Sequence, residues 1–231
     1  MTAAPLEWLD LAAWPRRGTF DFFRRFDKPY FSVCTRLDVA PLRRRLRDRP
    51  GAGINLAMHH VALRLANEQR PFRYRLDGEG VRVVPVVHGS MAVLRDDESL
   101  AFARIGYQRD FTAFVRDARQ SIDEARAPER VLGLLDQDHD LMHFTTLPWV
   151  AFTSFEHARN WGRDDSVPKI AFGRITDDGV HQWLPISVEV HHGLMDGLHV
   201  GRYVQGFEAA LAEPDAWLAL ASVESVFYAA L

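Results

Sequence analysis

"HHGLMDGLHVGRY", residues 191–203, follows directly on the alternating stretch "WLPISVEV", residues 183–190. In that stretch apolar and polar side chains alternate, which predicts a half-buried β-strand. After the Asp-Gly pair, apolar residues recur at steps of four, three and four, which predicts a helix over 198–212 packed on a sheet. The sequence therefore predicts a strand, a short turn and a helix, with a pair of histidines where the strand ends.

The two histidines point to chemistry only if one of them faces a cleft. Period-two geometry sends His192 to the side of the apolar residues and His191 to the other side, so the rings diverge. Diverging rings do not share a metal ion, because its ligands must converge at about 2 Å. Asp196 lies near the N-cap of the predicted helix. His192 is thus a candidate general base near pH 7, and a packed histidine bonded to a backbone group is the alternative that spacing alone leaves open.

Strands and helices alternate irregularly along the rest of the chain. Strands are predicted at 31–37 and 81–87, where Pro85 indicates an edge or a bulge, and helices at 55–68 and 110–125. The mixture lacks the strict alternation of βαβ units, which predicts an α+β fold with a mixed or antiparallel sheet and flanking helices.

Length and composition set the class of protein. The 231 residues, 47% of them hydrophobic, show no composition break, so we expect a single domain over 1–231, with 213–231 as a helical extension. A net charge of −3 and a single basic cluster, at 42–49, argue against a nucleic-acid partner. Cys34 is the only cysteine, and neither a signal peptide nor a run of 18 apolar residues is present, so we expect a cytoplasmic protein with no membrane partner.

Other catalytic and metal-binding signatures are missing from the sequence. It has no G-x-S-x-G elbow and no P-loop. "DQDHD", residues 136–140, begins like a calcium loop but has leucine at both the turn-glycine and the glutamate positions. We therefore expect no metal.

Four segments, in order, give the chain its likeness to a known family. "HHGLMDGLHVGR" (191–202) is similar to the hallmark "HHAVCDGFHVGR" of the chloramphenicol acetyltransferase family. "WPRRGTFDFF" (14–23), "LPWVAFTSF" (147–155) and "WLPISVEVHH" (183–192) resemble the family's opening, its N-P-W-V-S-F-T-S-F segment and its histidine strand. The resemblance runs from about residue 8 to residue 212. It implies a mixed sheet flanked by helices in a two-layer sandwich, assembled as a homotrimer with active sites between subunits.

The resemblance also implies catalytic roles. His192 matches the general base, which takes the proton of an acceptor hydroxyl as that oxygen attacks the thioester of acetyl-CoA. Thr145 stands where the family has the serine that hydrogen-bonds the tetrahedral oxyanion, with Thr146 as the alternative. Asp196 matches the aspartate that pairs with an arginine to hold the catalytic loop. Arg16 falls on that arginine and Arg17 is its near rival.

The remaining site residues concern coenzyme A and the acceptor. Trp149 and Arg174 resemble positions that contact coenzyme A, although a core role for Trp149 is the alternative. Phe23 and Phe31 keep the aromatic character of the acceptor pocket, whereas Ala171 replaces a threonine of the family. The resemblance therefore implies O-acetylation of chloramphenicol or another small hydroxyl compound. A catalytically silent relative that binds coenzyme A or a small ligand is the second hypothesis.

Overall fold

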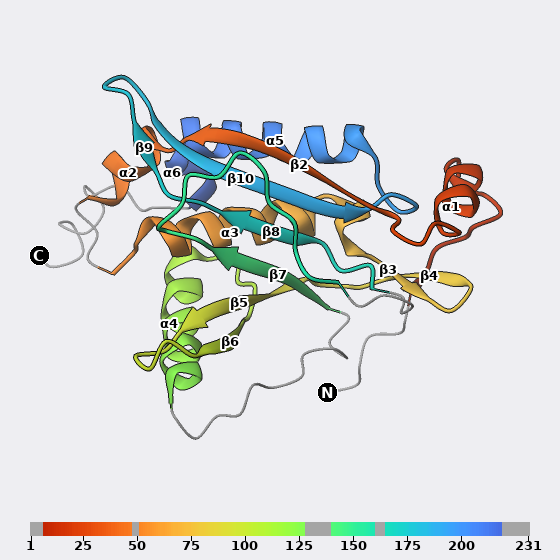
Figure 1. Cartoon of the computed structure of the whole chain (residues 1–231), viewed down its shortest axis with the longest axis horizontal. Coiled ribbons are helices and arrows are strands. Elements are labelled where there is room, and N and C mark those ends of the chain that lie inside the picture. The colour runs from red at the N-terminus through yellow and green to blue at the C-terminus, as the bar shows by residue number, and fades with distance from the viewer. Residues whose placement is uncertain (1–6, 48–50, 128–139, 160–164, 219–231) are drawn as a thin grey trace, which may run out of the picture.

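The fold is built on one large mixed sheet. The structure, a computed structural model, describes residues 7–47, 51–127, 140–159 and 165–218. The strands of the large sheet run in the spatial order β2 (Tyr30–Asp38), β10 (Gln182–His191), β8 (Lys169–Phe172), β7 (Leu141–Thr146), β5 (His88–Leu94) and β6 (Leu100–Ile105), and β9 (Thr176–Asp177) adds to β10 (Figure 1). Strand β7 runs parallel to β5 and β8, whereas the other neighbours are antiparallel, so the predicted mixed sheet is confirmed.

Strand β10 is the long central strand that carries the histidines. It is hydrogen-bonded to β2 on one side and to β8 on the other, with Val188 opposite both Val33 and Ile170. The residues of β10 from Leu184 to His191 are all buried, because its neighbours and the layers above and below the sheet cover them. The end of β10 is therefore a rigid support for whatever follows it.

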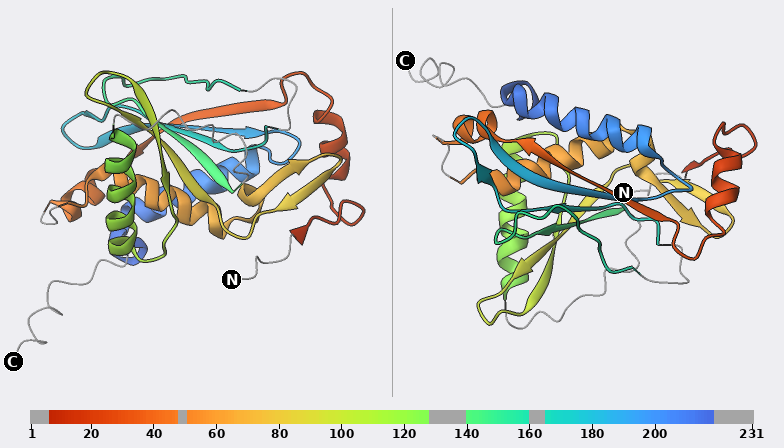
Figure 2. Two further views of the ribbon diagram at one scale, coloured as in Figure 1. Left: turned by 90° about the horizontal axis from the view of Figure 1, so that it is seen from below. Right: turned by 45° about the horizontal axis from the view of Figure 1, so that its top comes forward.

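Helices cover one face of this sheet. They are α2 (Ala40–Leu46), α3 (Ile54–Glu68), α4 (Phe111–Arg126), α5 (Gly197–Ala212) and α6 (Pro214–Leu218). Figure 2 shows α3, α4 and α5 on the same side of the strands. The main hydrophobic core lies between these layers and includes Phe144, Ile170, Phe172, Ile186 and Val188.

The segment after β7 lies on the opposite face. The hydroxyl of Ser187 donates to the carbonyl of Phe155, and the backbone N–H of His157 donates to the carboxylate of Glu189. Along β10, successive residues thus face the helices and this covering segment in turn. A side chain's position along β10 therefore decides which of the two layers it meets.

Helix α3 departs from the amphipathic pattern expected of it. Ten of its residues are buried, because it packs against the sheet and against other helices at once. His59 and His60 are both inside, and their rings bond the backbone carbonyls of Asn55 and Gln108. The structure therefore uses this histidine pair for packing.

A second, smaller sheet orders its strands as β1 (Glu7–Trp8), β4 (Gly80–Val83) and β3 (Tyr74–Asp77). The prediction of one strand over 81–87 is wrong, because β4 ends at Val83 and β5 begins only at His88. Pro85 has no N–H for a ladder and breaks the run. The short helix α1 (Arg17–Phe23) packs against this sheet through Phe20, and the 3₁₀ turn η1 (Arg70–Arg73) directly precedes β3.

The other predicted elements are confirmed. Strands β2 and β10 and helices α3, α4 and α5 match the predictions over 31–37, 183–190, 55–68, 110–125 and 198–212. Of the predicted helical extension over 213–231, helix α6 covers Pro214–Leu218 and residues 219–231 lie outside the described residues. Most of the rejected calcium loop, 136–139, also lies outside them. No helix in the described part of the chain is long and apolar enough to cross a membrane.

Candidate functional site

His192 sits just beyond the end of β10, in an aromatic frame. Its backbone N–H donates to the carbonyl of Pro29 (2.7 Å), which fixes the chain at the start of β2. Its ring stacks on Phe23, with centroids 3.7 Å apart and planes within 8°, and meets Phe31 at 4.7 Å. The ring is half-buried, and its Nδ1 is buried with no hydrogen-bond partner among the described residues. This arrangement leaves Nε2 as the nitrogen that can meet a ligand.

His191 goes the other way, as the alternation predicts. Its ring packs edge-on against Tyr30, and its Nδ1 accepts from the N–H of Gly193 (3.1 Å). Burial lowers the pKa of His191 to about 4, and the nearby charge of Arg159 adds to this effect. His191 is therefore a neutral, packed histidine.

Arg16 joins three points of the loop that follows His192. Its Nε lies 3.3 Å from a carboxylate oxygen of Asp196. Its Nη1 donates to the carbonyl of Leu194 (2.5 Å) and its Nη2 to that of His192 (3.4 Å). The rival Arg17 pairs with Asp21 instead, one turn along α1. The structure thus brings Arg16 and Asp196 together and ties both to the backbone of His192.

The small sheet and α1 hold Arg16 in place. A second core cluster contains Phe20, Tyr74 and Leu194, with Trp14 packed on its edge. The ring of Trp14 lies 5.8 Å from those of Phe20 and Tyr74. Since Leu194 belongs to this cluster, the packing also fixes the loop that Arg16 binds.

Asp196 caps helix α5. Its side chain accepts from the N–H of Leu198 (3.1 Å), and His199 at the third helical position completes a capping box. Burial by itself would raise the pKa of Asp196, but the neighbouring charges of His199 and Arg16 and the hydrogen bonds outweigh it and keep that pKa below its usual value. The carboxylate is therefore ionised and available to Arg16. His199 was not among the residues predicted from the sequence, although its position three residues after an N-cap aspartate was a usable signal.

Thr145 lies far from His192 within one chain. It pairs with Ala171, which in turn pairs with Ser187. At usual strand dimensions His192 is about 17 Å further along β10 and about 10 Å across, so the two are roughly 20 Å apart. They also lie on opposite faces, since Thr145 shares the face of Ser187 whereas His192 contacts Phe31, which is in register with Val190.

Thr145 and Thr146, the two residues predicted as alternatives for the oxyanion donor, face opposite sides of the sheet. The hydroxyl of Thr146 donates to the side chain of Asn55 on α3, so Thr146 faces the helices. Thr145 faces the other way, beside Ala171, which is fully buried. The structure brings Thr145 and Ala171 together, but it does not bring either of them to Phe23 or Phe31.

Trp149 and Arg174 lie on the loops that leave β7 and β8. The backbone N–H of Arg174 donates to the carbonyl of Val150 (2.8 Å), which links the two loops. Trp149 is 63% exposed, so it is not a core residue. Arg174 is exposed as well. Both side chains are exposed and can contact a ligand at the end of the sheet where Thr145 lies.

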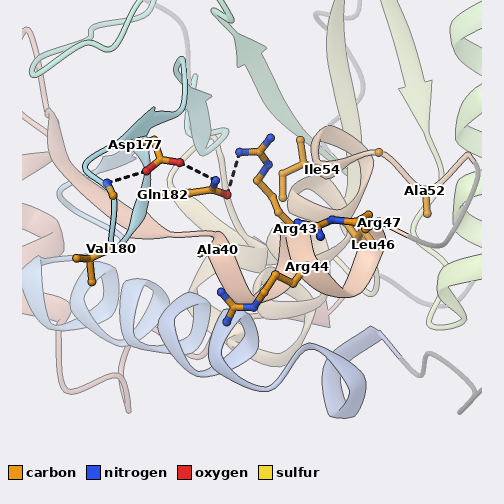
Figure 3. Close-up of a pocket in the computed structure, with 12 residues that line it drawn as sticks. Ala40, Arg43, Arg44, Leu46, Arg47, Ala52, Ile54, Asp177, Val180 and Gln182 are labelled. Carbon is orange, nitrogen blue, oxygen red and sulfur yellow. Dashed lines mark hydrogen bonds between the residues drawn. The ribbon is translucent and has the colours of Figure 1, made fainter.

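A cavity of about 500 Å³ lies at the opposite end of β10 from His192 (Figure 3). Its walls come from α2, the start of α3 and the β9–β10 turn, and they include Arg43, Arg44 and Arg47. Ile54 at its edge precedes Asn55, the partner of Thr146. The basic cluster at 42–49 therefore borders a cavity, although Asp48 and Arg49 lie outside the described residues.

The described residues contain no group of three or more side chains suited to a metal ion. What they do contain is a histidine in an aromatic frame at the end of the long strand of a mixed sheet, followed by an ion-paired turn. This fold and site suit an enzyme that uses a histidine as a general base.

Comparisons with known proteins narrow the class. The family model described as chloramphenicol acetyltransferase matches residues 5–208. A chloramphenicol acetyltransferase of Streptomyces acrimycini is 31% identical, over 94% of this chain and 97% of its own length. Chloramphenicol acetyltransferase 2 of Escherichia coli is 28% identical, over 85% and 92%. The chain belongs to the chloramphenicol acetyltransferase family.

Solved structures agree on the fold. A chloramphenicol acetyltransferase superposes with a TM-score of 0.80 at 25% identity, over 90% of this chain and all of that one. A dihydrolipoamide acetyltransferase of Azotobacter vinelandii gives a TM-score of 0.64 at 17% identity, over 94% and 100%, and is similar in fold alone.

Proposed function

We propose that this protein acetylates a hydroxyl group of chloramphenicol, or of another small molecule of similar size, with acetyl-CoA as the donor. It does so as a single acyltransferase domain in the cytoplasm. The observation that carries the proposal is the environment of His192. Its half-buried ring is held between Phe23 and Phe31, and Arg16 donates a hydrogen bond to its backbone carbonyl.

The proposed reaction is a direct transfer. Nε2 of His192 takes the proton of the acceptor hydroxyl while that oxygen forms a bond to the thioester carbon. The tetrahedral intermediate then collapses, the carbon–sulfur bond breaks, and the proton passes from His192 to the leaving thiolate. The products are the acetyl ester and free coenzyme A, and the enzyme returns to its starting state.

The oxyanion donor in this scheme is Thr145 of a second copy of the chain. The separation of roughly 20 Å and the opposite faces of the sheet argue against a site made within one chain. A cyclic homotrimer offers each His192 the Thr145 of a neighbour, and such closed symmetry is usual for oligomers of identical chains. Arg16 and Asp196 keep the base in position and transfer no proton.

Coenzyme A is proposed to bind on the Thr145 side. Trp149 offers an exposed apolar surface, and Arg174 offers a positive charge for a phosphate. The cavity bordered by α2 adds further arginines near the same end of the sheet, which favours an anionic ligand there.

Ala171 was predicted at the acceptor site, but it is fully buried beside Thr145 and offers an acceptor no surface. The acceptor is proposed to bind against Phe23 and Phe31, beside the base. These side chains give an apolar wall with little hydrogen-bonding capacity. An acceptor with an aromatic or aliphatic body and one reactive hydroxyl suits this wall, and chloramphenicol is the first compound to test.

The test is release of free thiol from acetyl-CoA, followed with a colorimetric reagent, with and without chloramphenicol and a panel of hydroxyl compounds. We expect acceptor-dependent thiol release and an acetylated product by mass spectrometry. No acceptor-dependent release with any compound would instead support the catalytically silent relative.

The matched control is the neighbouring histidine. We expect His192→Ala to abolish turnover while far-UV circular dichroism stays unchanged. We expect His191→Ala to keep appreciable turnover with a lower melting temperature, because His191 is a packed group. The reverse order of activity would contradict the assignment of the base.

A further inference from the structure

His199 is a partly buried histidine in direct contact with the turn that supports His192. Its side chain is 14% exposed. Its Nδ1 lies 2.8 Å from Oδ1 of Asp196, and the backbone N–H of the same residue points at Nδ1 at 3.1 Å, which is the capping-box contact. Apart from this capping contact, none of the roles described so far uses this ring.

The contacts of His199 continue without a break toward His192. Asp196 receives His199 on Oδ1 and Arg16 on Oδ2. Arg16 in turn donates to the backbone carbonyls of Leu194 and His192. Three side chains in sequence therefore connect the ring of His199 to the backbone of the proposed base.

The 2.8 Å contact between Nδ1 of His199 and Oδ1 of Asp196 indicates whether Nδ1 carries a hydrogen. One nitrogen cannot both accept from the backbone N–H of Asp196 and donate to its carboxylate. An unprotonated Nδ1 would keep the backbone contact but set its lone pair against a negatively charged oxygen at the shorter distance, which is the more repulsive arrangement. A protonated Nδ1 donates a charge-assisted hydrogen bond, one of the stronger kinds in proteins. The carboxylate therefore selects the form of His199 that carries a hydrogen on Nδ1.

The carboxylate of Asp196 needs such an anchor. Its side chain is 37% exposed, so water competes for it and it could leave Arg16 by rotating. The N–H of Leu198 and the ring of His199 both bind Oδ1, which directs Oδ2 toward Arg16.

We propose that His199 is a positioning residue for the transfer reaction: its Nδ1–H holds Asp196 in the orientation that keeps Arg16 on the carbonyl groups of the catalytic loop. The inference rests on the proposed role of His192 and adds a residue to it. His199 does not contact the reacting atoms.

A purely structural role for His199 is the rival account. The third position of a capping box usually holds Glu or Gln, whose side chain accepts from the N-cap N–H and stabilises the helix. If His199 did only that, a glutamate would replace it fully. If it anchors the carboxylate, a glutamate would fail, because it has no hydrogen to donate and brings a second negative charge.

The experiment compares three variants at position 199 in the full-length protein. We expect His199→Ala to lower kcat about tenfold, the size that the loss of one hydrogen bond to a charged group implies, with the KM for acetyl-CoA changed less than about twofold. We expect His199→Asn, which carries a donor at the position of Nδ1, to recover most of kcat. We expect His199→Glu to recover the melting temperature but not kcat.

The control for lost helix capping is Asp110→Ala. Asp110 caps α4 through the N–H of Ala113 (2.7 Å), away from His192, so this variant should lose thermal stability and keep kcat. If His199→Glu restores kcat together with stability, or if His199→Ala keeps full kcat, His199 is a helix cap only and the inference is wrong.

The outcomes also separate this inference from the proposed function. A His192→Ala variant that still turns over would overturn the proposed function itself. An inactive His192→Ala protein beside a fully active His199→Ala protein would leave that function standing and remove only the positioning role.

Discussion

The ring of His192 lies flat on the ring of Phe23, with centroids 3.7 Å apart and planes within 8°. With Phe31 on another side at 4.7 Å, the imidazole has little freedom to rotate about its side-chain bonds. A base held at one orientation loses less entropy on meeting the hydroxyl it must deprotonate. If His192 is the base, as proposed, Phe23 contributes to the reaction by orienting its ring.

Replacing Phe23 tests this contribution. Phe23→Leu keeps an apolar side chain but removes the flat surface, and we expect kcat to fall about tenfold because the base is less well oriented. Steady-state kinetics with acetyl-CoA and chloramphenicol would measure the change. Phe26→Leu is the matched control, since Phe26 contacts Phe23 at 5.3 Å and is 46% exposed. Equal kcat values for the two variants would contradict the orienting role.

Replacing Arg16 and replacing its neighbour Arg17 should have very different effects on kcat and on the free energy of unfolding. Arg16→Ala leaves Asp196 without its cation and two loop carbonyls without a donor. We expect a loss of about 100-fold in kcat and about 1–3 kcal/mol in the free energy of unfolding. Arg17→Ala removes only the exposed pair with Asp21 and should change that free energy by less than about 0.5 kcal/mol.

Chemical denaturation and the thiol-release assay on both proteins would check this contrast. Similar stability and rate for the Arg16 and Arg17 variants would discard the view that Arg16 holds the catalytic loop.

Buried histidines should make the fold sensitive to acid. Burial lowers the pKa of His59, His60, His143 and His191 from 6.5 to about 4. The unfolded chain therefore binds more protons between these values, so stability is full above about pH 6.5 and is lost as the pH falls toward 4.

Urea unfolding at pH 7 and pH 5 would measure this loss. His59 is fully buried, with Nε2 unpaired within the described part of the chain, and His59→Leu should reduce the difference between the two pH values. For one such histidine the difference over the whole range is at most about 3 kcal/mol. A wild-type stability that is the same at pH 7 and pH 5 would contradict the assigned burial effect.

Local pattern was sufficient to predict β10 and α5. Alternation and a four-three-four spacing are properties of a single segment, and Asp196 followed from the residue types that cap helices. The same approach failed at 81–87, where a β-rich composition hid a break at Pro85. Helix α3 also differed, because its exposure depends on which helices pack around it.

Contacts between distant segments could be anticipated only in part. The pairing of Arg16 with Asp196 came from a resemblance, and spacing could not have chosen Arg16 over Arg17, whose side chain turns to Asp21. His199 was missed because a histidine at the third helical position is not the usual capping residue. The separation of Thr145 from His192 depends on the strand order β10-β8-β7, which no local pattern contains.

The most direct test of the account mixes two inactive proteins. His192→Ala supplies chains with an intact Thr145, and Thr145→Ala supplies chains with an intact His192. If base and oxyanion donor come from different subunits of a cyclic trimer, random mixing by co-expression should restore about a quarter of wild-type activity, with each parent near zero. Mixed proteins as inactive as their parents would contradict a site shared between two copies of the chain.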